Sequence, residues 1–199
     1  VFVMTTNGLI AGFTGDGIPL WSHSMMESFG RLTFPNGRTG SPLLVDDLVI
    51  FRGITSNWGR QGPARDRFYA FEKSTGKPAW SSTPGVGPKD SSFSTPVLGW
   101  RDGRRVFYAG TGCGNIVCVD ARTGEPLWRY PMAIGGVNAS VVVEGNILIA
   151  VHGKENHDSS KTGRMIALDI SSRDLRSPTG GGTPVLSPDA ELWRLDVSS

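Results

Sequence analysis

The feature that most constrains this chain is a string, Thr-Gly-x-Pro-x-Trp, which occurs at residues 75–80 and again at residues 123–128. A short apolar run precedes each copy, and the run at residues 116–119 alternates in the manner of a β-strand. Glycine adopts a positive φ without strain, and a threonine hydroxyl bonds the local main chain. The string therefore predicts a tight turn between two antiparallel strands, with a tryptophan near the start of the second strand.

Two looser copies extend the repeat. Residues 8–21 hold one, and residues 164–170 begin another, whose second half is delayed until residues 191–195. The segment between them, 171–190, is rich in Ser, Pro and Gly and is expected to be an insertion in the turn. The tryptophans at equivalent places are Trp21, Trp80, Trp128 and Trp193. A repeat of this length is one supersecondary unit that buries its face only against its neighbours.

Two further strands precede each complete hairpin. Residues 41–45 and 48–51 come before the copy at 75–80, and residues 94–98 and 106–110 come before the next. Each unit is thus predicted to be four antiparallel strands in meander order, and such units repeated radially make a β-propeller. A stacked β-solenoid is the rival architecture, and the four-strand period argues against it.

The predicted fold is therefore all-β, a propeller of four-stranded antiparallel blades with about four blades present. The first unit starts at its second strand, and residues 25–38 are expected to be a polar loop. The blades are expected at approximately residues 1–38, 39–90, 91–137 and 138–199.

Composition limits the partners of the chain. Lys plus Arg is 20 and Asp plus Glu is 18, so the net charge of +2 gives no argument for nucleic acid or an anionic membrane. No apolar run approaches the roughly 20 residues that cross a bilayer, so no membrane span is expected. The two cysteines, Cys113 and Cys118, are expected to be free, because their spacing around a turn does not place them clearly opposite each other.

The strings at 73–80 and 120–128 are similar to the repeat of pyrroloquinoline-quinone (PQQ)-like β-propellers, and the resemblance covers essentially the whole chain. In that family the Thr-Gly turn and the tryptophan form a structural docking motif, with the tryptophan between neighbouring blades. The resemblance implies this role for Trp21, Trp80, Trp128 and Trp193 and for the turn glycines Gly76 and Gly124. We expect each tryptophan to be largely buried and close to the turn glycine of its own blade, with Trp193 as the exception.

The family contains quinone- and calcium-dependent alcohol or sugar dehydrogenases, a non-enzymatic outer-membrane assembly lipoprotein, and extracytoplasmic repeat proteins without assigned chemistry. Dehydrogenases of the alcohol class carry two adjacent cysteines against the quinone, whereas four residues separate Cys113 from Cys118. We therefore expect a non-catalytic scaffold or binding module without a cofactor. The alternative is part of a dehydrogenase that uses PQQ and calcium. The resemblance alone implies a periplasmic or extracellular location.

In a propeller, the loops that join blades share one face with the loops between second and third strands. In this chain they are residues 25–38, 52–66, 84–93, 131–138 and 152–163. Binding residues tend to lie on such loops. Trp58, Arg60 and Arg65 would suit a planar anion. In the run of Glu155, Asn156, His157 and Asp158, the Glu, Asn and Asp oxygens suit calcium, but the run lacks the spacing of a calcium loop, so no metal site is predicted. The alternative is that both loops are simply solvated.

Propellers that resemble this chain usually close with seven or eight blades, so four blades correspond to about half of a ring. An open half exposes apolar blade faces and an unpaired strand edge, which promotes association. We expect a protein partner to supply the missing half, either the remainder of the same polypeptide or a second copy.

Overall fold

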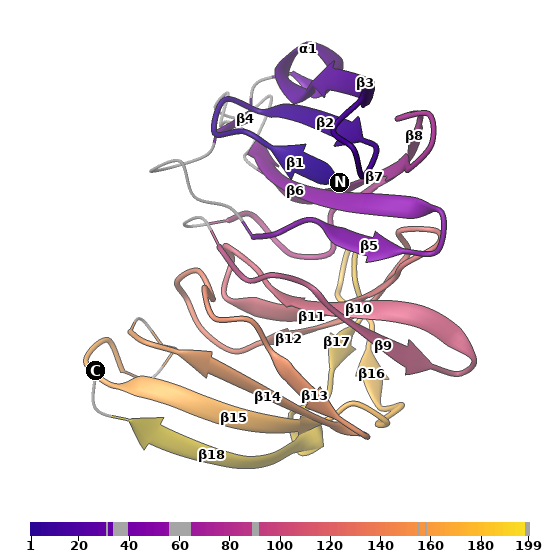
Figure 1. Ribbon diagram of the computed structural model, residues 1–199. Helices are drawn as coiled ribbons and strands as arrows, with labels where there is room; N and C mark the ends of the chain where they lie inside the picture. Colours follow the sequence, from indigo (N-terminus) through magenta and orange to yellow (C-terminus); the bar gives the residue numbers. More distant parts are fainter. Residues whose placement is uncertain are drawn as a thin grey trace.

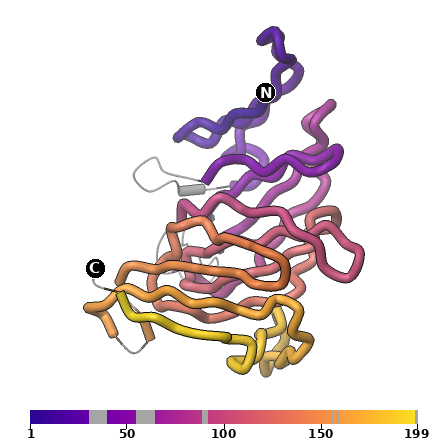
Figure 2. The backbone as a smooth tube through the Cα atoms, turned by 60° about the horizontal axis from the view of Figure 1, so that its bottom comes forward, coloured from indigo at the N-terminus to yellow at the C-terminus, as the bar shows by residue number. Residues whose placement is uncertain are grey.

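The computed structural model describes residues 1–30, 32–33, 40–55, 65–88, 92–154, 156–157 and 159–197. Four β-sheets, antiparallel apart from one parallel strand pair, follow one another along the chain (Figure 1). Viewed from another side, the sheets lie in succession from the N-terminal to the C-terminal end (Figure 2). The all-β fold of antiparallel blades is thereby confirmed, and within the described residues helix is limited to α1 (Met25–Phe29) and a 3-10 turn (Pro188–Ala190).

The sheets differ in size, and the third also takes in two strands from further along the chain. The first sheet contains β1 (Phe2–Met4), β2 (Leu9–Phe13) and β3 (Pro19–Ser24). The second contains β4 (Leu32–Thr33), β5 (Leu43–Val45), β6 (Leu48–Thr55), β7 (Arg65–Glu72) and β8 (Pro78–Ser82). The third contains β9 (Val97–Arg101), β10 (Arg104–Gly110), β11 (Asn115–Asp120), β12 (Pro126–Pro131), β16 (Leu175–Arg176) and β17 (Val185–Leu186). The fourth contains β13 (Val142–Glu144), β14 (Ile147–His152), β15 (Gly163–Asp169) and β18 (Glu191–Val197).

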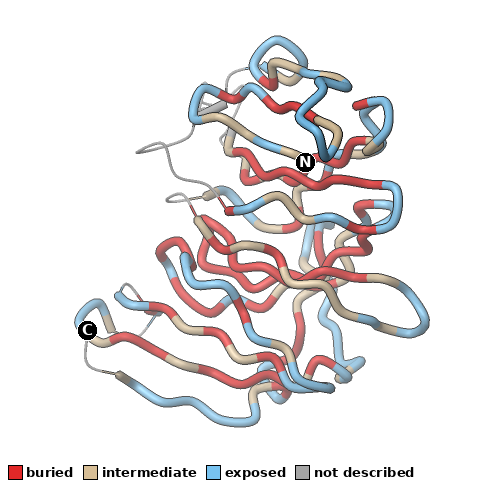
Figure 3. The backbone as a smooth tube through the Cα atoms, viewed as in Figure 1, coloured by how far each residue is buried: buried red, intermediate tan, exposed pale blue. Residues whose placement is uncertain are grey.

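Apolar side chains alternate between the two faces of a strand, so each inner sheet contributes to two cores. In β11, Ile116 and Cys118 pack toward the fourth sheet, whereas Val117 and Val119 pack toward the second. A third core lies between the first and second sheets. Figure 3 shows the result as buried positions along the inner strands, while β18 is largely exposed.

The Thr-Gly turns form as their residues predict. Gly76 and Gly124 have φ of 71° and 76°, the left-handed region that favours glycine. In the second of these turns, Asp120 Oδ1 accepts hydrogen bonds from the main-chain N–H groups of Arg122, at 2.9 Å, and Thr123, at 3.0 Å. The hairpin is therefore closed by its own local polar groups.

The tryptophans of the first two units meet the turn glycine of the following unit, so the expectation that each meets its own is wrong for Trp21 and Trp80. A Cβ placed on Gly76 would lie 2.5 Å from the Trp21 ring, and one on Gly124 would lie 2.5 Å from the Trp80 ring. Trp21 Nε1 also donates to the Lys73 carbonyl at 2.9 Å. The reason is geometric: side chains stand perpendicular to their own sheet and so reach the neighbouring one.

The third and fourth tryptophans lie where the insertion changes the pattern. Trp128 is fully buried and shares a core with Leu186 and Ala190 from segment 171–190. Trp193 is 40% exposed. The insertion is more ordered than its composition indicated, because β17 pairs in parallel with β12 and the Arg129 N–H donates to the Pro184 carbonyl at 2.8 Å.

Residues 25–38, expected to be a loop, instead contain α1 and β4. The Ser24 hydroxyl caps the helix by accepting a hydrogen bond from Glu27 N at 3.3 Å, and Met25 is buried. The main chain of β4 then pairs with the far end of β6. None of the described helices has the length and apolar character needed to cross a bilayer.

The outward face of the fourth sheet exposes apolar side chains. Trp193 and Leu195 lie opposite Ala167 and Met165 in the register of β15 and β18, and Leu195 is 55% exposed. On the innermost strand, Val142 is 61% exposed. This face has the composition of a sheet–sheet contact rather than of a solvated surface.

We expect the 199-residue chain on its own to associate through this face. Light scattering behind a sizing column should give a mass above the 21.3 kDa of one chain. A compact monomer that binds no hydrophobic dye would contradict this expectation.

Both cysteines are free and buried. Burial is the largest influence on Cys118 and raises the pKa of its thiol from 9.0 to about 12. Above pH 9 the unfolded chain therefore loses a proton that the folded chain retains, and stability falls as the pH rises.

We expect the free energy of unfolding to fall between pH 9 and 10, by at most about 1.4 kcal/mol per pH unit for this group. Burial also raises the pKa of Tyr108, but from an ordinary value of 10.0, so the tyrosine contributes mainly at higher pH. Urea unfolding at several pH values measures how steeply the free energy of unfolding falls with pH. The Cys118→Ala variant should lose most of this pH dependence. An unchanged pH dependence in that variant would show that Cys118 is not its source.

Candidate functional site

The segments that lead into β5, β9 and β13, in the second, third and fourth sheets, are hydrogen-bonded side by side. Ser41 N donates to Thr95 Oγ1 at 3.1 Å, and Thr95 N donates to Ser140 Oγ at 3.0 Å. Phe93 N donates to the side-chain carbonyl of Asn138 at 3.2 Å. Three blades are thereby joined at the end of the strands where the blade-joining loops lie, on the left of Figure 1.

A buried ion pair, Arg52 with Asp66, lies at this end of the second sheet. The stretch 52–66 was expected to be a loop throughout, but β6 continues to Thr55 and β7 begins at Arg65, so both charged residues lie in strands. Arg52 Nε is 2.9 Å from Asp66 Oδ1, and a second contact joins Nη2 to Oδ2. The side chains are only 4% and 1% exposed.

The same pair attaches the second sheet to the third. Arg52 Nη1 donates to the Gly110 carbonyl at 2.8 Å and to Ser92 Oγ at 2.9 Å, while Asp66 Oδ2 accepts from Gly112 N at 2.7 Å. The Ser92 hydroxyl also donates to the Val137 carbonyl, toward the fourth sheet. Arg52 and Asp66 therefore bind groups of the protein itself. These hydrogen bonds satisfy the polar atoms of the two side chains, as a buried ion pair requires.

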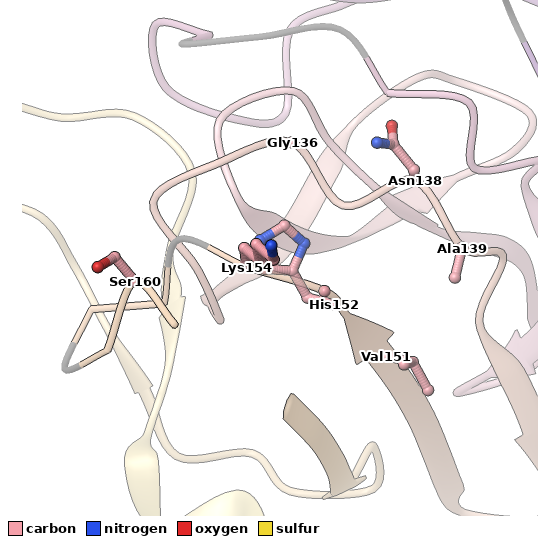
Figure 4. Close-up of a pocket in the computed structure, with 8 residues that line it drawn as sticks. Gly136, Asn138, Ala139, Val151, His152, Lys154 and Ser160 are labelled. Carbon is pink, nitrogen blue, oxygen red and sulfur yellow. The ribbon is translucent and has the colours of Figure 1, made fainter. Parts of the chain in front are cut away.

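An open hollow of about 580 Å³ lies at this end of the fourth sheet, against the segment that joins the third sheet to the fourth. Figure 4 shows its lining, which comes from the segment before β13, the end of β14 and the following loop. The lining residues are Gly136, Asn138, Ala139, Val151, His152, Gly153, Lys154 and Ser160. The hollow thus combines two of the expected loops, 131–138 and 152–163.

One wall of the hollow is fixed by main-chain contacts. The N–H groups of Met132 and Ala133 both donate to the Gly114 carbonyl, at 3.0 and 2.9 Å, and Val137 N donates to Thr111 O at 3.0 Å. A Cβ on Gly114 would lie 1.9 Å from the Ala133 carbonyl oxygen. This position therefore admits only glycine without a shift of the main chain.

The opposite wall is held by Asn156. Its side-chain amide donates to Thr162 O at 2.7 Å, and its main-chain N–H donates to Ser159 O at 2.9 Å. The residue is 3% exposed and forms an isolated bridge with Ala133. In this geometry Asn156 shapes the loop, and it does not line the hollow.

The other predicted site residues are dispersed. His157 is exposed on the same loop, whereas Arg65 begins β7 in the second sheet. Trp58, Arg60 and Asp158 lie outside the described residues. Sequence reasoning named the loops around the hollow, but it missed Lys154, Ser160 and the buried pair.

Within the described parts of the chain, no three His, Cys, Asp or Glu side chains gather where they could hold a metal ion. Cys113 Sγ lies 3.0 Å from the Thr111 hydroxyl, whereas Cys118 is enclosed within β11, so the thiols do not form an adjacent pair.

Comparison with solved structures shows the same fold. BamB from Moraxella catarrhalis matches with a TM-score of 0.58 and 19% identity, over 98% of this chain and 48% of that one. The quinohemoprotein alcohol dehydrogenase ADHIIG from Pseudomonas putida HK5 matches with a TM-score of 0.63 and 13% identity, over 99% of this chain and 32% of that one. A europium-containing methanol dehydrogenase matches with a TM-score of 0.51 and 18% identity, over 98% and 29%.

These structural similarities establish the fold but not the activity, because the sequence identities are low. The chain spans about half the length of the BamB structure and about a third of the two dehydrogenases. A search of curated protein sequences finds no match. The family model described as outer membrane protein assembly factor BamB matches residues 1–199. The chain therefore belongs to this family of PQQ-like repeat proteins.

Proposed function

We propose that this chain is a segment of a non-catalytic β-propeller scaffold, which binds a protein partner through the loop ends of its strands. The observation that carries the proposal is the open hollow at the loop end of the fourth sheet. Its walls are held by hydrogen bonds within the protein, so the surface is preformed. Lys154 and Ser160 are exposed on it, and they offer an ammonium group and a hydroxyl to a partner.

The family's description, outer membrane protein assembly factor, supports a role in that assembly and a periplasmic location. The nearby buried charges support a scaffold for a separate reason. Arg52 and Asp66 are fully engaged in joining blades, and a catalytic centre would instead direct such groups at a substrate. The alternative, part of a quinone- and calcium-dependent dehydrogenase, shares the fold.

Photo-crosslinking in the organism that makes the protein tests the proposal. A photoreactive residue in place of Ser160, at the hollow, is expected to give an adduct of one discrete mass with another protein. The same residue in place of Lys77, exposed in a turn at the other end of the strands, is the control and should give none. Absence of an adduct at Ser160, or the same adduct from both positions, would overturn the proposal.

A further inference from the structure

Two equivalent hollows lie at the turn ends of the strands. These strand ends are on the right of Figure 1. One is bounded by the turn between β5 and β6 and the other by the turn between β9 and β10, and each also by the Pro-x-Trp strand of the same sheet. The hollow beside the second sheet has about 250 Å³ and is lined by Asp47, Leu48, Glu72, Ala79, Trp80, Arg122 and Thr123. The hollow beside the third sheet has about 440 Å³ and is lined by Arg101, Asp102, Arg104, Leu127, Trp128, Arg173 and Leu175.

The two hollows differ because the insertion replaces a Thr-Gly turn. In the smaller hollow, Arg122 and Thr123 of the next unit's turn form a wall; in the larger one, Arg173 and Leu175 of segment 171–190 take that place. The net charge of the lining residues also differs in sign between the two hollows. The smaller lining has two carboxylates and one guanidinium, whereas the larger has three guanidiniums and one carboxylate.

The positive charge is concentrated around Asp102. Arg173 pairs with its Oδ1, and Arg101 Nε is 3.8 Å from its Oδ2, so two guanidiniums share one carboxylate. Arg101 is fixed in place, because it donates to the Ile170 carbonyl and, at 2.9 Å, to the Ser172 carbonyl. Its side chain is 11% exposed, so water screens this charge only partly.

The charge of the third arginine in the lining is partly balanced by nearby carboxylates. Arg104 lies 3.9 Å from Asp120 and 3.6 Å from Glu125, and its side chain is exposed. Among the lining residues, the excess charge therefore belongs to the pair Arg101 and Arg173, and Asp169, outside the lining, also interacts with Arg101. Beside it, Leu127 and Leu175 supply an apolar wall above the buried Trp128.

We propose that this hollow binds an acidic residue of a peptide, flanked by an apolar side chain. The incoming carboxylate would accept hydrogen bonds from Arg173 and neutralise the excess charge beside Arg101, as planar guanidiniums do with carboxylates. The apolar neighbour would lie against Leu127 and Leu175. The site is at the opposite strand ends from the proposed partner surface and does not depend on that function.

Fluorescence polarisation with a labelled peptide of alternating glutamate and leucine tests the proposal on the 199-residue chain. The peptide is expected to bind, and its glutamine counterpart should not. Binding should weaken as salt is raised, since the site is partly exposed. Equal binding of the two peptides would overturn the proposal.

Two substitutions should act in opposite directions. Arg173→Gln removes a donor and should weaken binding about tenfold. Asp102→Asn removes the internal competitor for the guanidiniums and should strengthen binding. Asp102 has a φ of 50°, and its counterpart Asp46 has a φ of 46°. Asparagine tolerates this conformation, so the variant should fold.

Arg122→Gln, in the smaller hollow, is the matched control and should leave binding unchanged. Thermal melting of every variant checks that the fold is intact. Affinities that are the same for the unsubstituted chain, Arg173→Gln and Asp102→Asn would overturn the proposal, and so would an equal loss in Arg122→Gln.

Discussion

Replacing Asp66 with Asn is expected to lower the free energy of unfolding by about 3–5 kcal/mol, the usual cost of removing one partner of a buried ion pair. The substitution leaves the Arg52 guanidinium charged, almost fully buried and without its counter-ion. It also weakens the bond from Gly112 N, which attaches the third sheet. Urea unfolding followed by circular dichroism measures the change.

The matched control is Asp46→Asn. Asp46 lies 3.9 Å from Arg105, and both side chains are substantially exposed, so its loss should cost under about 1 kcal/mol. The double variant Arg52→Met with Asp66→Asn should be less damaging than the two single costs added, because no uncompensated charge stays buried. A cost for Asp66→Asn as small as that of Asp46→Asn would show that the pair does not join the sheets.

The second large effect is expected from Gly76→Ala and Gly124→Ala. Each alanine would occupy a positive φ, at about 1–2 kcal/mol, and would also press on a tryptophan of the preceding unit, at about 1–3 kcal/mol for overpacking. The added methyl groups would lie 2.5 Å from the rings of Trp21 and Trp80, respectively, unless the neighbouring atoms shift. The expected loss of stability is the sum of both contributions.

Gly103→Ala separates the two contributions. Gly103 has a φ of 74°, and no atom lies within 4 Å of the position its Cβ would take. It therefore reports the backbone cost alone. Urea midpoints should fall clearly further for Gly76→Ala and Gly124→Ala than for Gly103→Ala, and equal shifts would contradict docking of the tryptophans on the next unit.

Local features of the fold could be predicted from the sequence because they depend on neighbouring residues. The turn around Gly124 is closed by Asp120 and by its own main chain, and β11 shows its two faces in the alternation of residues 116–119. The residue that Trp80 packs against could not be predicted from neighbouring residues. Gly76 is closer in sequence, but the indole projects off its sheet and meets Gly124 of the next.

The candidate site was less predictable, because it depends on how sheets stack. Charged residues are usually exposed, so the sequence pattern favours a solvated loop for Arg52 and Asp66. Their burial follows from contacts with Gly110 and Gly112, which lie more than forty residues further along the chain. The visible signal was an arginine directly after the apolar run 48–51, with an aspartate two residues before the apolar residues that begin at Phe68.

Reconstitution with quinone and calcium tests the central claim, a non-catalytic scaffold, most directly. The protein as the cell makes it is incubated with both, desalted, and examined for quinone absorbance and for dye reduction with alcohols or sugars. We predict that no quinone absorbance stays with the protein and that no dye is reduced. Retained quinone together with substrate-dependent dye reduction would contradict the account.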